Sequence, residues 1–153
     1  MATYSFTNIF ATVTGPGGSF KVSGDGAGSA EEGITAEMDE DKDTQTIGAD
    51  GEVMHSLHAG RAGKITFRLL KTSPVNNLLS QLYNFQTLSS LTHGRNVIRL
   101  TDVARGDVVS GREAAFARQP RVNYSKDGDI LEWVFNVGKL DMLLGSGEPD
   151  ANN

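Results

Sequence analysis

Cysteine is absent from the sequence, and this absence removes several classes of function at once. Without it the chain has no disulfide bond, no thiol nucleophile and no thiolate metal site. Long apolar runs are missing too: no window of about 18 consecutive apolar residues occurs, so we expect no membrane-spanning helix. The N-terminus has no basic stretch before an apolar one, so we expect no signal peptide and a soluble protein made in the cytoplasm.

Motifs for catalysis are also lacking. There is no Gly-x-Ser-x-Gly elbow, no Ser-x-x-Lys pair and no glycine-rich loop followed by Gly-Lys-Ser/Thr. The clusters at residues 15–18 and 24–28 are therefore interpreted as turns. We expect neither enzyme activity nor a cofactor.

The net charge is small, but acidic and basic residues are strongly segregated along the chain. The net charge of −5 argues against a free-standing nucleic-acid-binding protein. Residues 31–52 contain nine acids and one base, a charge of −8, whereas residues 61–121 contain ten bases and three acids, a charge of +7. The two segments form either solvated faces that partly pair within one chain or complementary edges between copies. The second arrangement is heterologous, and such contacts close into rings or continue into filaments.

The 153 residues fit one domain, and 18 glycines with short apolar runs favour strands over helices. Alternation and turn residues predict six to eight strands, with Ile65, Phe67 and Leu69 sharing one face and Leu131, Trp133, Phe135 and Val137 another. The predicted strands are 4–14 and 19–22 (a hairpin around residues 15–18), 33–38, 64–71, 96–102, 108–118, and 121–125 with 130–137 (a hairpin around Asp127-Gly128), the last extended by 141–144.

One amphipathic helix is predicted over about 74–86. Ser73 is the expected N-cap and Pro74 suits the first helical position. The apolar side chains recur at helical spacing and define one face, made of Val75, Leu78, Leu79, Leu82 and Phe85. The predicted fold class is therefore mainly β: an antiparallel sandwich or barrel over residues 1–144 with one flanking helix. Residues 145–153 are predicted to form a polar flexible tail.

Residues 39–63 are an irregular, polar and acidic stretch that does not fit this pattern. A segment of this length without regular structure is unusual inside a compact domain and is often functional. Met54 and Leu57 supply apolar anchors, and four glycines would let the segment fold sharply. We expect an extended arm that docks on a partner.

Two metal-binding alternatives exist in the arm. Asp39, Asp41, Asp43 and Asp50 match positions 1, 3, 5 and 12 of a calcium loop, but Thr44 replaces the glycine of position 6 and an aspartate replaces the usual glutamate of position 12. His55 and His58 form a His-x-x-His pair that lacks an evident third zinc ligand. A solvated or interface-forming acidic loop and two ordinary loop histidines are favoured over both metal sites. A base-stacking platform at Trp133 and Phe135 is likewise less favoured than a core position.

Taken together, these segments resemble the tail tube proteins of contractile-tailed phages over nearly the whole chain. The resemblance rests on the order and spacing of short motifs: Tyr4-Ser5-Phe6, Thr14-Gly15-Pro16-Gly17-Gly18, Glu31-Glu32-Gly33-Ile34, Ile47-Gly48-Ala49-Asp50-Gly51, Met54-His55-Ser56-Leu57-His58-Ala59, Leu69-Leu70-Lys71-Thr72-Ser73-Pro74-Val75-Asn76 and Asn123-Tyr124-Ser125-Lys126-Asp127-Gly128.

The resemblance implies a structural subunit that forms hexameric rings, which stack head to tail into a hollow tube inside a contractile sheath. It implies a place in the virion after assembly in the host cytoplasm. The implied partners are further copies of the chain, the sheath protein, a baseplate or tube initiator, a tail terminator, a tape measure protein, and genomic DNA that passes through the lumen without specific binding. A tube subunit of a type VI secretion or pyocin-like system is the alternative.

The arm is the predicted site of contact between subunits. The residues expected to make these contacts are Asp39, Asp41, Asp43, Asp50, Met54, His55, Leu57, His58 and Arg61. The outward-facing residues Thr66, Arg68, Glu132 and Asn136 are candidates for lining the lumen.

Overall fold

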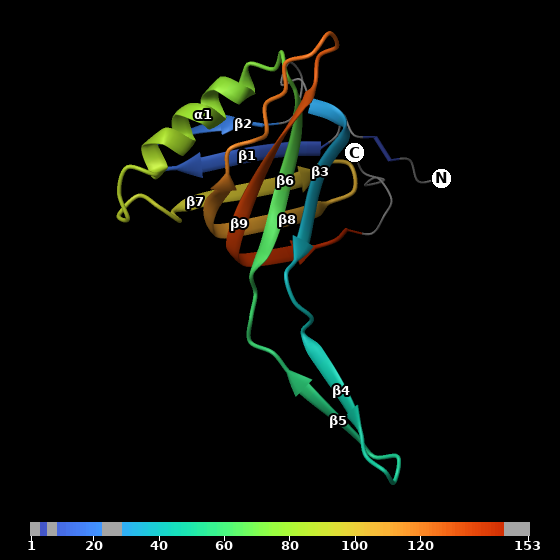
Figure 1. The fold of residues 1–153 in the computed structure, drawn as a ribbon. Helices are drawn as coiled ribbons and strands as arrows, with labels where there is room; N and C mark the ends of the chain where they lie inside the picture. Colours follow the sequence, from blue (N-terminus) through green and yellow to red (C-terminus); the bar gives the residue numbers. More distant parts are fainter. Residues whose placement is uncertain (1–3, 6–8, 23–28, 146–153) are drawn as a thin grey trace.

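A computed structural model describes residues 4–5, 9–22 and 29–145. These residues form nine strands and one helix, arranged as a mainly antiparallel β fold from which a long hairpin extends (Figure 1). The elements in chain order are β1 (Ile9–Gly15), β2 (Gly18–Lys21), β3 (Ser29–Met38), β4 (Asp43–Ile47), β5 (Val53–Leu57), β6 (Gly63–Leu70), α1 (Val75–Gln86), β7 (Asn96–Asp102), β8 (Asp107–Arg118) and β9 (Ile130–Leu143).

Seven strands form one antiparallel sheet in the order β2-β1-β7-β8-β9-β6-β3. The sheet bends over itself, so that β1 and β7 run across the direction of β6 and β3 (Figure 1). The two long strands belong to both halves: β8 pairs with β7, and β9 with β6, while β8 and β9 pair with each other. The outer strands β2 and β3 are not paired with each other, so the described residues form an open, sandwich-like sheet and not a closed barrel.

The bend coincides with an irregular position in β8. Glu113 has φ of 54°, a left-handed conformation that is uncommon outside glycine. The β7–β8 register shifts here, since Asn96 pairs with Ala114 and Ile98 with Gly111, leaving two residues of β8 opposite Val97. Such a bulge bends and twists a strand. Opposite it, a Cβ at Gly138 of β9 would lie 2.9 Å from Glu113 Oε2 and 3.1 Å from the Glu113 Cβ, so the close approach at this corner favours a glycine.

The core lies between the two halves of the sheet and under the helix. Both predicted strand faces are confirmed, because Ile65, Phe67 and Leu69 of β6 are buried together with the alternate residues of β9. Trp133 is 2% exposed and its ring centre lies 5.8 Å from that of Phe116. Trp133 is therefore a core residue, as predicted, and not part of a base-stacking platform.

The helix is confirmed, but its buried face differs from the predicted one. Val75, Leu79 and Leu82 join the core, whereas Leu78 and Phe85 are exposed and Gln86 is buried instead. Gln86 can be buried because its side-chain oxygen accepts a 2.6 Å hydrogen bond from Asn96 Nδ2. The N-cap is Pro74 and not Ser73, although Ser73 Oγ still accepts a bond from the Val75 amide at 3.2 Å.

The remaining strand predictions are confirmed in outline, with one exception. The hairpin turn at residues 15–18 joins β1 to β2, and residues 141–143 extend the last strand. The predicted strand 121–125 is wrong: residues 119–129 connect β8 to β9 without pairing to any described strand. The N-terminal part of the first predicted strand, at residues 6–8, and most of the polar tail lie outside the described residues.

Candidate functional site

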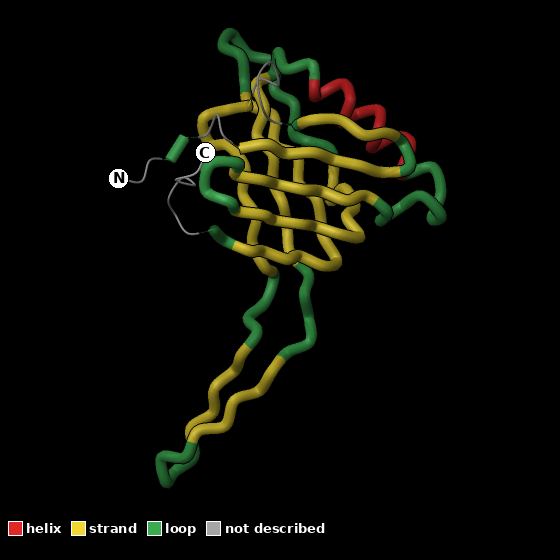
Figure 2. Tube along the Cα trace, turned by 180° about the vertical axis from the view of Figure 1, so that it is seen from behind, coloured by secondary structure: helices red, strands yellow, loops and turns green. Residues whose placement is uncertain are grey.

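The arm is a regular two-stranded ribbon, where the sequence analysis expected irregular chain. Five residues of β4 pair antiparallel with five of β5, from Asp43 opposite Leu57 to Ile47 opposite Val53. The ribbon continues from the paired strands β3 and β6 and projects away from the body (Figures 1 and 2). The expected long extended arm is therefore confirmed, but it is a regular paired hairpin and not an irregular segment.

The tip of the arm is a tight glycine turn. The Gly51 amide donates to the Gly48 carbonyl at 3.0 Å, and the Gly48 amide donates to the Glu52 carbonyl at 2.7 Å. Gly51 has φ of 90°, which a residue with a side chain rarely adopts. Asp50 supports the turn by accepting a bond from the Glu52 amide at 3.0 Å. Its place at the tip leaves the side chain exposed.

The two faces of the ribbon differ in chemistry. Residues opposite one another in the ladder share a face, so Ile47, Val53 and Leu57 lie on one side and Thr44, Thr46 and Ser56 on the other. The three apolar side chains are 65%, 45% and 86% exposed, and no described part of the chain covers them. Met54 lies on the hydroxyl face and is 60% exposed. Asp43, Gln45 and His55 share the face of these three residues, so the arm presents an uncovered mixed face, on which exposed apolar side chains flank the Asp43–His55 pair.

Both histidines of the arm are bound to neighbours on β4. His55 Nδ1 lies 3.0 Å from Asp43 Oδ2, and His58 Nε2 lies 2.6 Å from Thr44 Oγ1. The two rings are on opposite faces of the ribbon, since His55 and His58 are three residues apart in an extended segment. They therefore do not converge on one zinc ion.

The four aspartates of the calcium pattern are also separated. Asp39 binds Lys64 at 3.0 Å, and Asp43 binds His55 near the start of β4. Asp50 lies beyond the other end of β4, and that strand alone spans about 13 Å at the usual rise per residue. No group of three or more possible metal ligands is found in the described part of the chain.

Ion pairs fix the root of the arm on the body. Arg61 donates through Nη2 to Asp141 Oδ1 on β9, and Arg112 Nη2 of β8 lies 3.0 Å from Asp141 Oδ2. The Arg61 carbonyl also accepts a backbone bond from Leu140 at 2.8 Å. The hydrogen bond from Arg61 is the main cause that holds the pKa of Asp141 below its usual value. Together with the Asp39–Lys64 pair, these contacts set the direction in which the arm leaves the body.

The structure therefore divides the predicted contact residues into two groups. Asp39 and Arg61 lie at the root and bind the body of their own chain, while the others lie along the ribbon or at its tip, where all but the half-buried His58 are exposed to solvent. Sequence reasoning missed Ile47 and Val53, which lie on the same face of the ribbon as Leu57. The alternation of Val53, His55 and Leu57 could have found this face. Asp141 carries no local signal, because its partners are 29 and 80 residues away.

The residues considered for the lumen do share one outward face. Thr66 and Arg68 of β6 lie beside Glu132 and Asn136 of β9, and Arg68 Nε is 3.5 Å from Glu132 Oε2. Opposite charges thus neutralise each other on this face.

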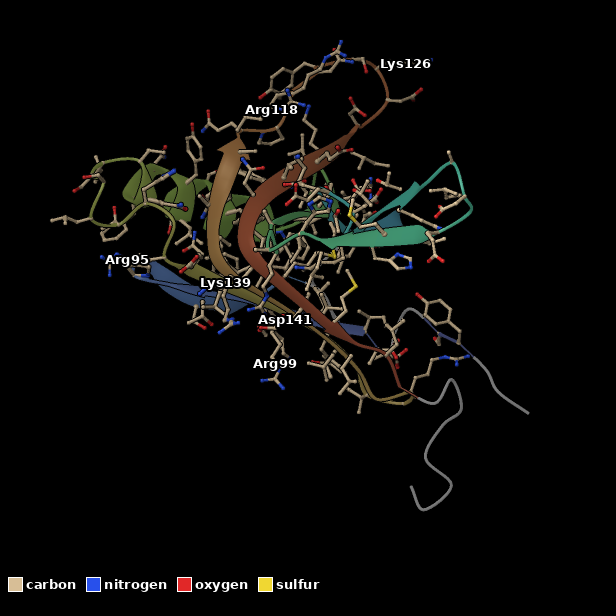
Figure 3. All side chains as sticks on the ribbon, turned by 90° about the horizontal axis from the view of Figure 1, so that it is seen from below. Arg95, Arg99, Arg118, Lys126, Lys139 and Asp141 are labelled. Atoms are coloured by element: carbon tan, nitrogen blue, oxygen red, sulfur yellow. The ribbon has the colours of Figure 1, made fainter. Side chains whose placement is uncertain are left out.

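Most cations of the basic segment do not pair with the acidic segment. Lys64 with Asp39 is the one ion pair between the two segments among the described residues. Arg95 and Arg99 lie on one side of the molecule and Arg118 on the other (Figure 3), and none of the three forms an ion pair with a described residue. The charge segregation is thus largely left unmatched within one chain.

Comparison with known proteins assigns these features to a family. The model of the bacteriophage PhiTE tail tube protein family matches residues 1–145, nearly the whole chain. The chain belongs to this tail tube family. It is accordingly a structural subunit of a phage tail tube and not an enzyme. No curated protein sequence matches it.

Solved structures share the fold of this tail tube protein at low sequence identity. The sheath–tube complex of an extracellular contractile injection system in the extended state has a chain 10% identical, with a TM-score of 0.59 and coverage of 93% of this chain and 92% of that one. The sheath/tube terminator of that system gives 12% identity, a TM-score of 0.55 and coverage of 94% and 98%. The tube-terminating cap of the anti-feeding prophage is 9% identical, with a TM-score of 0.54 and coverage of 95% of this chain and 93% of that one. No helix among the described residues is long and apolar enough to cross a membrane.

Proposed function

We propose that this tail tube subunit forms hexameric rings that stack head to tail into a hollow tube, and that the arm joins one subunit to another. The observation that supports this role most directly is the exposure of three apolar side chains, Ile47, Val53 and Leu57, on one face of the projecting ribbon. An isolated two-stranded hairpin is at best marginally stable in water. A second chain that covers this face would stabilise the arm.

The arm and the body it contacts would use different surfaces of the subunit. Such a contact is heterologous, and its repetition builds either a closed ring or a stack that continues. The charge distribution agrees with this geometry, because the arm is acidic and Arg95, Arg99, Arg118 and Arg121 form no ion pair with a described residue. Asp41, Asp43, Asp50, Met54, His55, Leu57 and His58 are the proposed contacts, with Asp39 and Arg61 holding the arm in position.

The other partners belong to the same proposal. The similar structures are named as a sheath–tube complex, a tube terminator, a tube-terminating cap and a baseplate, which supports a sheath around this tube and a baseplate and terminator at its ends. A tape measure protein would set the length, and assembly would take place in the host cytoplasm. Six copies would carry a formal charge of 6 × −5 = −30, and the part of it that faces the lumen would favour passage of DNA without binding.

Electron microscopy tests the proposal directly. The purified protein is examined in negative stain over a series of concentrations, alone and with a baseplate initiator. We expect six-fold rings and hollow tubes of uniform diameter whose length grows with concentration. Particles that stay monomeric under both conditions, or rings of another symmetry, would contradict it.

A tube of a type VI secretion or pyocin-like system is the second candidate. It is supported by the similar structures, which come from an extracellular contractile injection system and the anti-feeding prophage. The neighbouring genes distinguish the two candidates. Capsid and terminase genes beside this gene would support the phage tail, and a secretion ATPase gene would support the alternative.

A further inference from the structure

The connection between β8 and β9 has the sequence of a strand but no strand partner. Residues 121–125, Arg-Val-Asn-Tyr-Ser, alternate polar with apolar or aromatic side chains and precede Asp127-Gly128, which is a strong hairpin signal. In the structure, this segment pairs with no described strand, and every residue from 121 to 130 is exposed. A strand-forming segment is therefore left with an open edge.

The body holds this segment in place through Lys71. Lys71 Nζ donates to the Asn123 carbonyl at 2.9 Å and lies 3.7 Å from the centre of the Tyr124 ring, while the Lys71 amide donates to the Asp129 carbonyl at 3.2 Å. These contacts hold the middle of the segment and the residue before β9 without covering the segment. Val122 and Tyr124 remain 48% and 84% exposed.

The segment also carries positive charge beside a hollow. Arg118 and Arg121 line a hollow of about 510 Å³ whose lining also includes two carboxylates, Asp129 and Glu132, and Glu132 pairs with Arg68 of β6. Neither arginine forms an ion pair within the part of the chain that the structure describes. Cations, exposed apolar side chains and an unpaired edge thus occur together.

The position of this surface is opposite to that of the arm. The arm leaves one end of the body, and the 119–129 connection forms the other end (Figures 1 and 2). In a head-to-tail stack, the arm of one copy points toward this end of the next copy. Within a single chain, the two surfaces do not meet.

We propose that the outer edge of β4 pairs with residues 121–125 of a second copy of this chain, as an added strand. The inference rests on the proposed function, since it names the surface that receives the arm. In the two-stranded sheet, β4 has one edge on β5 and one edge free. Backbone pairing would satisfy that edge and the open edge of residues 121–125, and alternate side chains would set the register.

Charge selects β4 over β5 as the pairing strand. Glu40, Asp41 and Asp43 lie on the β4 side of the ribbon, while β5 contains no acid. Arg118 and Arg121 would face these carboxylates across the contact. The exposed side chains of Ile47 and Val53 would at the same time meet Val122 and Tyr124.

Cysteine cross-linking in assembled tubes tests the pairing without background, because the chain has no cysteine of its own. Three double variants combine Asn123→Cys with Thr44→Cys, Gln45→Cys or Thr46→Cys, to sample the register. Two matched controls combine Asn123→Cys with Ser56→Cys or Met54→Cys, the β5 residues that face Thr44 and Thr46. A disulfide forms only when the two Cα atoms approach within about 7 Å.

We expect at least one β4 pair to give a ladder of covalent multimers after oxidation, and the β5 pairs to give none. Tubes that form normally but yield no ladder with any β4 pair, or that cross-link through β5, would overturn the pairing and leave the proposed function standing. Absence of rings and tubes from the wild-type protein would instead overturn the proposed function, and the pairing with it.

A charge exchange provides the second test. Asp41→Arg and Arg121→Asp should each raise the concentration needed for stacking about fivefold, the effect of one lost ion pair per contact, and the double variant should restore it. Arg99→Asp, on the other side of the molecule, is the control and should leave stacking unchanged. If Arg121→Asp behaves like Arg99→Asp, the arm docks elsewhere.

Discussion

Arg61 at the root of the arm donates a hydrogen bond to Asp141 near the end of β9, across 80 residues of sequence. Arg112 binds the second oxygen of the same carboxylate at 3.0 Å. One side chain of the body thus holds the arm and the middle of β8 together. The direction of the arm, on which stacking would depend, is set by this contact.

Asp141→Asn should weaken the protein in a pH-dependent way. The pKa of Asp141 is lowered in the folded state by Arg61 and Arg112, so its contribution to stability is present above the ordinary aspartate pKa of about 3.9. That contribution is lost as the pH falls through the lowered folded value. The free energy of unfolding in urea should therefore differ between wild type and variant at pH 6, and the difference should shrink below about pH 4. A difference that stays constant with pH would contradict this account.

Removal of residues 41–60 should abolish stacking and leave the body folded. The deletion joins Glu40 to Arg61 next to the backbone bond from the Asp39 amide to the Ala62 carbonyl, which closes a short hairpin. Every deleted residue lies outside the core, and a shorter loop costs less closure entropy, so the melting temperature should not fall. Circular dichroism checks the fold, and electron microscopy checks the tubes.

A variant that keeps the full-length arm tests whether stacking depends on the arm's exposed apolar side chains or only on its length. Ile47→Ser with Val53→Ser and Leu57→Ser retains the ribbon and removes these side chains. Stacking should be weakened in this variant as well. Normal tubes after the deletion of residues 41–60 would show that the arm is not the connector.

Excess calcium should leave the melting temperature unchanged. Binding to the folded state alone would raise it, but the aspartates of the pattern are held apart, with Asp39 bound to Lys64 and Asp43 to His55. Thermal denaturation with and without calcium is the measurement, and magnesium at the same ionic strength is the control. A rise specific to calcium, lost in Asp43→Asn, would restore the calcium loop as a candidate.

The sequence predicts an element well where one face of that element is buried. Alternation identified β6 and the first half of β9, because their inner residues all enter the same core. Apolar periodicity also predicts the helix, but it wrongly places Leu78 and Phe85 in the core and does not predict that Gln86 is buried. Burial of Gln86 depends on Asn96, ten residues away, and no helical period carries that information.

The sequence fails where structure depends on pairing without burial. The arm is a ribbon of polar strands, exposed on both sides apart from a few partly covered side chains, so its composition indicates a loop although its backbone is fully paired. Residues 121–125 show the reverse case, a strand pattern without a partner in the chain. Gly63 was expected to help a sharp fold, but it is a packing position, since a side chain there would lie 2.5 Å from the Glu37 carbonyl oxygen.

Trp133→Ala should destabilise the subunit by roughly 3–5 kcal/mol, as expected for the loss of a large buried aromatic. The indole is 2% exposed, packs near Phe116, and donates from Nε1 to Asn76 Oδ1 at 3.0 Å, which links β9 to the helix. Trp133→Phe keeps most of the volume and loses the bond, so it should cost about 1–2 kcal/mol. Asn76→Ala removes this acceptor together with the bonds that Asn76 Nδ2 donates to the Leu70 and Lys71 carbonyls, so it should also destabilise the subunit, by less than Trp133→Ala. Urea denaturation should show the largest loss for Trp133→Ala, and an unchanged Trp133→Ala would place the indole at the surface.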